Sequence, residues 1–306
     1  MFRFARAVLV TFLAVLLVGS CVSASELTAH YSGVLLSDVG DYDWWYGCSP
    51  TSAGMMLSGY DRDGSNPNIV PGVTADLSTF VHGSNYDETV AMIASPGNIA
   101  DFYVNGYYAS GDDVAQPWHS FDSLADFMGT SQDSVGNVNG GTTFWFYTNG
   151  MPLTYTDIFS YGPSYWGSDG MYGIYEYLDY AGYENEVVSL YSQYIDAVSP
   201  TNGFTFEEYM AEIDAERPVI IQVDGHSMTG IGYNAATETV YLHDTWSAGV
   251  HSMTWGGSYS GMSQYGVCVL QLEPGDFNNP VPAPAALMSL CTGLALLGGY
   301  RLRRKQ

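Results

Sequence analysis

Four short apolar runs in the last third of the chain limit its fold more than any other feature. They cover residues 218–223, 228–233, 239–243 and 265–272, and glycines and polar residues stand between them. Apolar runs of this length, bounded by turn residues, are typical of β-strands. We therefore predict an antiparallel sheet in the C-terminal part of the chain.

Helical patterns come mainly before this sheet. Apolar residues at helical spacing predict a helix over residues 50–59, with Ser49 as its N-cap and Gly59 at its exit. Thr205 and Glu208 form a capping-box pattern that opens a helix ending near residue 215. Further helices are expected near residues 89–93, 121–128 and 171–181, and strands near 142–147 and 186–190. The predicted fold class is α+β, with a helix-rich N-terminal part and an antiparallel C-terminal sheet.

The charge of the chain is strongly acidic and unevenly distributed. The 306 residues carry a formal net charge of −24. Between Arg6 and Arg301 there are only two arginines against all 32 acids, a net charge of −30. A nucleic-acid-binding surface needs clustered Lys and Arg, so we expect no nucleic-acid partner.

The first 24 residues have the layout of a signal peptide. Arg3 and Arg6 precede an apolar run from Ala7 to Val18, and Val22-Ser23-Ala24 fits a small-residue cleavage site. The run is short for a membrane span. We predict cleavage after residue 24 by signal peptidase and export of a mature protein that begins at Ser25.

The last 30 residues have the layout of a sorting signal. A Pro/Ala-rich linker leads to an apolar span over residues 286–300, and Arg301, Arg303, Arg304 and Lys305 follow. This layout resembles the PEP-CTERM tail of Gram-negative bacteria, although Ala283 stands where the usual core has Glu. The resemblance implies processing by an exosortase, membrane contact only through residues 277–306, and a location at the cell surface or in the extracellular matrix. An ordinary C-terminal membrane anchor is the alternative. Residues 25–276 would then form the functional domain, with an aromatic- and Gly-rich insertion at about 85–165.

Two cysteines remain once both ends are set aside. Cys48 and Cys268 would form one disulfide, or else one reactive and one buried thiol. Cys48 directly precedes the first predicted helix, whose positive end favours a thiolate and lowers the pKa of the cysteine. A nucleophilic cysteine also needs a base that is oriented by a third group.

His226 and Asp244 are the candidates for these two roles. His226 lies at a glycine-marked turn that opens a predicted strand, and Asp244 ends the next strand. Neighbouring antiparallel strands would bring the Asp244 carboxylate to the His226 ring. Gly47 would allow the close approach to the backbone that a substrate carbonyl needs, and Trp246 would shield the His–Asp hydrogen bond from water.

These segments resemble a known enzyme family. Gly-Cys-Ser-Pro-Thr at residues 47–51, Gly-His-Ser-Met at 225–228 and Leu-His-Asp-Thr-Trp at 242–246 are similar to papain-like cysteine peptidases of the bacteriocin-processing, double-glycine-leader type. The resemblance implies a papain-like fold and a protein or peptide substrate. It also implies Cys48 as nucleophile, His226 as general base and acid, and Asp244 as the orienting acid. No cofactor or metal is implied.

One departure from the family keeps other functions open. Papain-like enzymes place a Gln upstream of the cysteine as a second oxyanion donor, but residues 25–65 contain neither Gln nor Asn. A transglutaminase-like acyltransferase uses the same Cys, His and Asp order. A catalytically inactive surface or biofilm-matrix protein on a peptidase fold is the non-enzymatic alternative.

Overall fold

The computed structural model describes residues 33–61, 69–71, 73, 75–83, 87–96, 98 and 121–273. The predicted signal peptide and the predicted sorting tail lie outside these residues. Within them, no helix combines the length and the apolar character that a membrane crossing requires.

The strands of the described region form an antiparallel sheet. Its main path runs β2-β3-β9-β4-β5-β6-β7, while β1 pairs with β5 and β8 pairs with β9. The strands are β1 (Val34–Leu35), β2 (Leu153–Thr154), β3 (Val187–Tyr194), β4 (Val219–Val223), β5 (His226–Asn234), β6 (Thr239–His243), β7 (His251–Thr254), β8 (Ser258–Tyr259) and β9 (Met262–Leu272). Because β4 and β5 form a hairpin in which Val223 pairs with His226, the histidine opens its strand at a tight turn.

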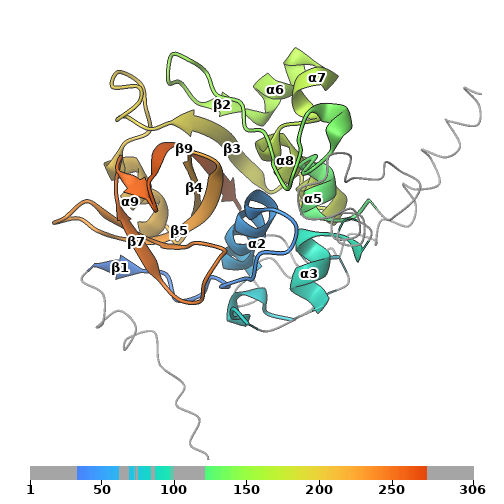
Figure 1. Cartoon of the computed structure of the whole chain (residues 1–306), viewed down its shortest axis with the longest axis horizontal. Helices are drawn as coiled ribbons and strands as arrows, with labels where there is room; N and C mark the ends of the chain where they lie inside the picture. The colour runs from blue at the N-terminus through green and yellow to red at the C-terminus, as the bar shows by residue number, and fades with distance from the viewer. Residues whose placement is uncertain are drawn as a thin grey trace, which may run out of the picture.

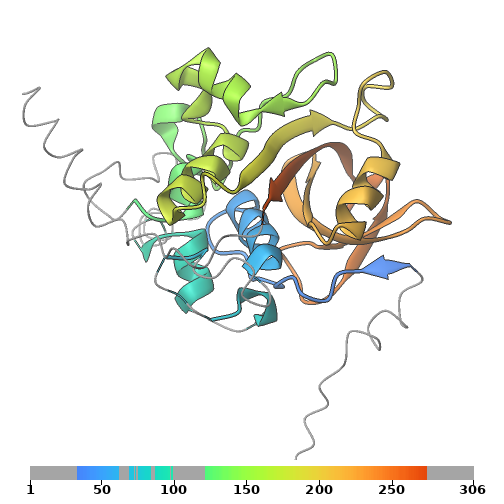
Figure 2. The same cartoon turned by 180° about the vertical axis from the view of Figure 1, so that it is seen from behind.

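The helices gather mainly beside the sheet (Figures 1 and 2). They are α2 (Cys48–Asp61), α3 (Asp87–Ile93), α5 (Leu124–Phe127), α6 (Tyr155–Tyr161), α7 (Pro163–Trp166), α8 (Gly170–Ala181) and α9 (Phe206–Asp214), with short 3₁₀ helices at Leu77–Thr79 and Asp133–Val135. Figure 1 shows the sheet curling on one side of the molecule and α3, α5 and α8 on the other, with α2 between them. The N-terminal end of α2 therefore meets the sheet.

Two hydrophobic cores hold this arrangement together. The larger core joins α2 and helices such as α5, α6 and α8 to one face of the sheet, which contributes Ile220, Ile231 and Cys268. The smaller core fills the curled side of the sheet, where α9 packs against the odd-numbered residues of β4. Since side chains alternate along a strand, β4 turns Ile220 and Gln222 toward α2.

The predicted strands of the C-terminal part are confirmed, and so is the capping box of Thr205 and Glu208. The helix predicted for residues 50–59 begins at Cys48 and continues to Asp61, so Ser49 lies inside its first turn and is not its N-cap. Gly59 does not end the helix. A Cβ on Gly59 would lie 2.6 Å from the Pro218 ring, so the missing side chain makes room for Pro218.

The prediction of a strand at residues 142–147 is wrong. Only an isolated bridge between Thr143 and Asp169 forms there. The Asp169 carboxylate accepts hydrogen bonds from the backbone of Trp145 and of Tyr172, which ties the segment to the start of α8 instead of to a neighbouring strand. The described parts of the predicted insertion, among them Leu124, Leu153 and Ile158, belong to the larger core.

Candidate active site

Cys48 is the first residue of α2 and is partly exposed. Cys268 lies on β9 and is fully buried. Both thiols are free, so the disulfide alternative is excluded. Of the remaining alternative, one reactive and one buried thiol, the structure shows the buried Cys268, and the reactivity of Cys48 stays a prediction.

The electrostatic environment of Cys48 differs from the expected one. Burial of the sulfur among protein atoms raises the pKa of the Cys48 thiol above its ordinary value. Hydrogen bonds from the Ser227 backbone and from the Ser49 side chain lower the pKa, but they do not outweigh desolvation. The expectation of a thiolate at neutral pH is therefore contradicted, because the cost of desolvating an anion exceeds the favourable local dipoles.

Gly47 has a different role from the expected one. A Cβ at this position would lie 2.8 Å from the Gly140 carbonyl oxygen and 2.9 Å from the Thr130 methyl group. The protein's own backbone, and not an open approach for substrate, occupies the space beside Gly47. The glycine thus allows segment 130–140 to pack against the residue that precedes the cysteine.

Ser49 belongs to a chain of hydrogen bonds beneath Cys48. The Ser49 and Ser227 hydroxyls lie 2.9 Å apart, and the Ser227 hydroxyl donates to the Gln222 Oε1 atom at 2.8 Å. Either hydroxyl of the Ser49–Ser227 pair can be the donor, and the Ser49 hydroxyl also reaches the Cys48 sulfur. The chain connects the first turn of α2 to both strands of the β4–β5 hairpin.

His226 is held at the start of β5 and is only 4 % exposed. Its Nε2 atom lies 2.8 Å from the backbone carbonyl oxygen of Asp244. A carbonyl oxygen only accepts, so this contact places the proton of the neutral ring on Nε2 and leaves Nδ1 as the basic nitrogen. Burial lowers the pKa of His226, although the Asp244 carbonyl and carboxylate act in the opposite direction.

The Asp244 carboxylate does not form the expected hydrogen bond to His226. It accepts the backbone N–H groups of Trp246 and Ser247 at 2.9 Å each, and the Tyr259 hydroxyl at 2.7 Å. Burial disfavours its charge, but these hydrogen bonds prevail and lower the pKa of Asp244. Asp244 therefore orients His226 through its main chain, while its side chain closes the loop that follows β6.

That loop places Trp246 over the histidine. The ring centroids of His226 and Trp246 are 3.8 Å apart, with an angle of 20° between the ring planes. Trp246 itself remains 49 % exposed. It covers one face of the imidazole and contributes to the desolvation that lowers the pKa of His226.

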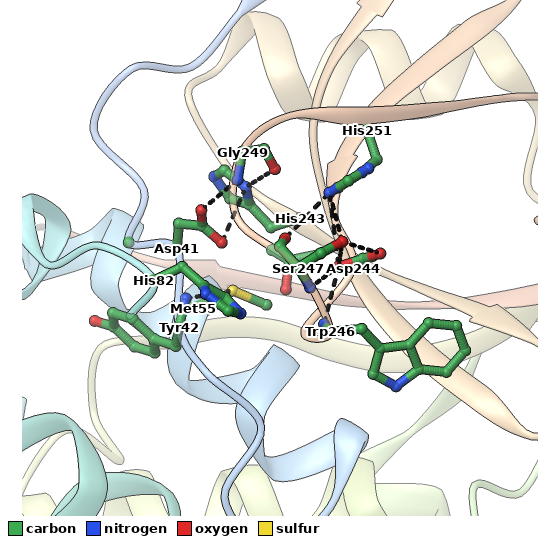
Figure 3. A network of polar contacts seen from close by, with 12 residues as sticks. Asp41, Tyr42, Met55, His82, His243, Asp244, Trp246, Ser247, Gly249 and His251 are labelled. Carbon is green, nitrogen blue, oxygen red and sulfur yellow. Dashed lines mark hydrogen bonds and ion pairs between the residues drawn. The ribbon is translucent and has the colours of Figure 1, made fainter. Parts of the chain in front are cut away.

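A second polar cluster ties this loop to the segment before Cys48 (Figure 3). The Asp41 carboxylate accepts the backbone N–H of Gly249 at 2.7 Å and lies 3.6 Å from His243 Nδ1. His251 Nε2 lies 3.2 Å from the Ser247 hydroxyl and 3.7 Å from the Asp244 carboxylate. Figure 3 shows these groups around the loop that carries Trp246, so the cluster fixes the loop from both sides.

The structure brings most of the predicted residues to one place. Cys48 contacts Ser227, the residue after His226, and His226 in turn contacts Asp244 and Trp246. Among the described residues, no hydrogen bond joins the Cys48 sulfur to the His226 ring. The raised pKa of Cys48 and the lowered pKa of His226 favour the neutral thiol and the neutral imidazole, and Nδ1 is the basic nitrogen of that ring.

The sequence reasoning missed Ser227 and Gln222. A signal for Gln222 was present, since it is the single polar residue in the run Val219-Ile220-Ile221-Gln222-Val223. A polar side chain inside a buried strand needs a hydrogen-bond partner. Among the residues that the structure describes, no group of three or more His, Cys, Asp or Glu side chains is placed to hold a metal ion.

Comparison with known proteins gives one family match. Residues 157–266 match the model of the Peptidase_C39 like family, over about a third of the chain. The matched range contains His226 and Asp244 and begins after Cys48. No curated protein and no solved structure matches the chain. The α+β fold with its antiparallel sheet is compatible with a papain-like fold, and the family match supports a papain-like cysteine peptidase family and suggests cysteine peptidase activity.

Proposed function

We propose that the protein is an exported cysteine peptidase of the bacteriocin-processing type, in which Cys48 and His226 perform the chemistry. The observation that carries the proposal is the meeting of the α2 N-terminus with the start of β5. There the partly exposed residue Cys48 contacts Ser227, and the preceding residue, His226, has its tautomer set by a main-chain carbonyl. The family match over the part of the chain that contains His226 supports it.

The proposed reaction begins from the neutral pair. The Cys48 thiol transfers its proton to His226 Nδ1 as the sulfur attacks the carbonyl carbon of a peptide bond. His226 then gives this proton to the leaving amine, the C–N bond breaks, and a thioester to Cys48 remains. Water attacks the thioester while His226 accepts its proton, which releases the acid and restores the thiol. The backbone N–H of Cys48 is one donor to the oxyanion.

A thiol-directed epoxide and a peptide-hydrolysis assay test this function. We expect the epoxide to label Cys48 in the wild-type protein, and we expect Cys48→Ala and His226→Ala to abolish hydrolysis. Cys268→Ala and His82→Ala are matched controls, because Cys268 is a buried thiol and His82 pairs with Asp43 away from the cysteine. Both controls should keep the wild-type rate. Labelling of Cys48 that is equal in the wild-type and His226→Ala proteins would exclude His226 as the base.

Specific observations also favour the non-enzymatic alternative. The pKa of Cys48 is raised, and no upstream Gln is present to assist the oxyanion. A surface or matrix protein on an inactive peptidase fold would show no hydrolysis of any peptide and no His226-dependent labelling. The same two assays therefore separate the two functions.

Export and surface location form part of the proposal. We expect the mature chain to begin at Ser25 and to lose the segment after about Pro282 by exosortase cleavage. Intact mass spectrometry of the secreted protein measures both ends. Released protein that still contains Arg301 would contradict the sorting signal.

A further inference from the structure

Gln222 has a buried hydrogen-bond donor that the folded protein leaves unused. The side chain is 2 % exposed, and its Nε2 atom has no hydrogen-bond partner. Its Oε1 atom is occupied by the Ser227 hydroxyl. An unsatisfied buried donor costs about 1–3 kcal/mol, so a polar group that reached this nitrogen would gain a hydrogen bond.

The position of Gln222 connects it to the candidate nucleophile. β4 turns Ile220 and Gln222 toward the core that contains α2, whereas Val219, Ile221 and Val223 face the other core. Gln222 is the register partner of Ser227. Ser227 in turn contacts Cys48 through its backbone N–H and Ser49 through its hydroxyl. Two successive contacts, from Gln222 to Ser227 and from Ser227 to Cys48, therefore connect the side chain that carries the unused N–H₂ group to the residue at which an acyl group would be attached.

The hydrogen-bonding chemistry of the Gln222 amide indicates which group could accept its unused N–H. A peptide acyl group on Cys48 brings carbonyl oxygens, which only accept hydrogen bonds, and the Gln222 nitrogen only donates. The upstream segment, residues 33–47, contains no Gln or Asn that supplies a side-chain amide. Gln222 supplies a side-chain amide from β4, which follows Cys48 in the sequence.

We infer that Gln222 is a substrate-binding residue whose Nε2 donates a hydrogen bond to a carbonyl oxygen in the acyl half of a peptide substrate. The inference rests on the proposed peptidase function. Two carbonyls share this chemistry, the reacting carbonyl and the carbonyl of the preceding residue. An interaction with the reacting carbonyl strengthens in the transition state and lowers kcat when it is lost, whereas an interaction with the other carbonyl mainly affects KM.

The test compares Gln222→Met with Gln264→Met. Gln264 is a matched control because it is equally buried, on the neighbouring strand β9, and its Nε2 is also unpartnered. Its oxygen, however, accepts the Gly256 backbone N–H at 2.8 Å, whereas the Gln222 oxygen accepts the Ser227 hydroxyl. Peptide hydrolysis is measured together with the rate of Cys48 alkylation by iodoacetamide, a reaction that forms no oxyanion.

We expect Gln222→Met to reduce kcat/KM about 10²–10³-fold, the usual effect of one lost oxyanion donor. The loss falls on kcat if the partner is the reacting carbonyl, and on KM if it is the other carbonyl. The alkylation rate of Cys48 and the melting temperature should stay at the values of Gln264→Met. Gln222→Glu, which keeps the acceptor for Ser227 and removes the amide, should lose hydrolysis in the same way.

Three results would overturn the inference. Equal hydrolysis by Gln222→Met and Gln264→Met would show that the donor meets no substrate. A parallel loss of alkylation would show that Gln222 acts only by placing the thiol. A wild-type protein that hydrolyses no peptide would overturn the proposed function, and the substrate role of Gln222 with it.

Discussion

Replacement of Asp244 separates the two ways in which this residue can support His226. In the structure the imidazole bonds to the main-chain carbonyl of Asp244, which no side-chain substitution removes. The carboxylate instead accepts two backbone N–H groups and the Tyr259 hydroxyl. The amide of Asp244→Asn keeps one oxygen for the two N–H groups and offers its nitrogen to the Tyr259 oxygen.

The expected loss of folding stability differs strongly between Asp244→Ala and Asp244→Asn. Hydrogen bonds to a charged group contribute about 1.5–3 kcal/mol each. Asp244→Ala loses the two backbone bonds, the Tyr259 bond and the longer bonds of the Ser247 hydroxyl, but water replaces part of this loss, and we expect a destabilisation of about 2–4 kcal/mol. This corresponds to roughly 4–16 °C in melting temperature for a domain of this size. For Asp244→Asn we expect a destabilisation below about 1 kcal/mol. Its hydrolysis rate should stay within about fivefold of the wild-type rate, which corresponds to about 1 kcal/mol in the activation barrier.

Thermal unfolding and peptide hydrolysis of both variants check this reasoning. If the carboxylate oriented the ring, as in a Ser-His-Asp triad, the Asn variant would lose about 10⁴-fold in kcat. We expect near wild-type hydrolysis for Asp244→Asn, and a lower melting temperature with reduced hydrolysis for Asp244→Ala. A thousandfold loss in Asp244→Asn at an unchanged melting temperature would refute the role of the carbonyl.

Three further predictions concern the surroundings of the site. Gly47→Ala should cost about 1–3 kcal/mol, because its Cβ meets the Gly140 carbonyl. We expect a lower melting temperature and slower alkylation of Cys48, and a wild-type melting temperature would contradict the clash. Trp246→Ala should raise the pKa of His226 toward its ordinary value, because the stacked ring contributes to its desolvation; an unchanged NMR titration would refute this. Burial raises the pKa of Asp61 to about 6, and of Asp169 and Glu176 to about 7. In the unfolded chain these carboxyls titrate near 3.9–4.3, so the folded state binds more protons between about pH 4 and 7 and stability falls as pH rises through that window. Burial lowers the pKa of His226 and His243, which acts in the opposite direction, so the test compares variants. Glu176→Gln should raise the urea midpoint more at pH 8 than at pH 5, and an equal change at both pH values would contradict the raised pKa of Glu176.

The C-terminal strands and the location of His226 followed from local sequence patterns. Apolar runs and turn residues are local signals, and β6 has the predicted bounds of Thr239–His243. The segment at residues 142–147 has the residue types of a strand, but its backbone bonds to the cap of α8. Sequence patterns do not specify which distant carboxylate will accept such a backbone group.

In the candidate site too, the sequence did not specify which atoms of distant residues would form hydrogen bonds. The order of Cys48, His226 and Asp244 was sufficient to predict that His226 and Asp244 meet. It did not show that the carbonyl of Asp244 would take the imidazole while the carboxylate turned to Tyr259. This choice depends on the path of the loop after β6, which Asp41 also fixes through Gly249. Gly47 was misinterpreted for a related reason, since its close neighbour Gly140 is distant in sequence.

The protonation states of the two central groups agree with the charge of the whole domain. Burial raises the pKa of Cys48 and lowers that of His226, so both shifts favour the neutral thiol and the neutral imidazole over an ion pair. A domain with 32 acids and few cations disfavours one more anion, although salt screens this long-range effect beyond about 8 Å. Local desolvation is therefore the larger cause. Attack by the sulfur then has to coincide with proton transfer to His226, and every donor that stabilises the resulting oxyanion, Gln222 included, acts on a charge absent from the resting site.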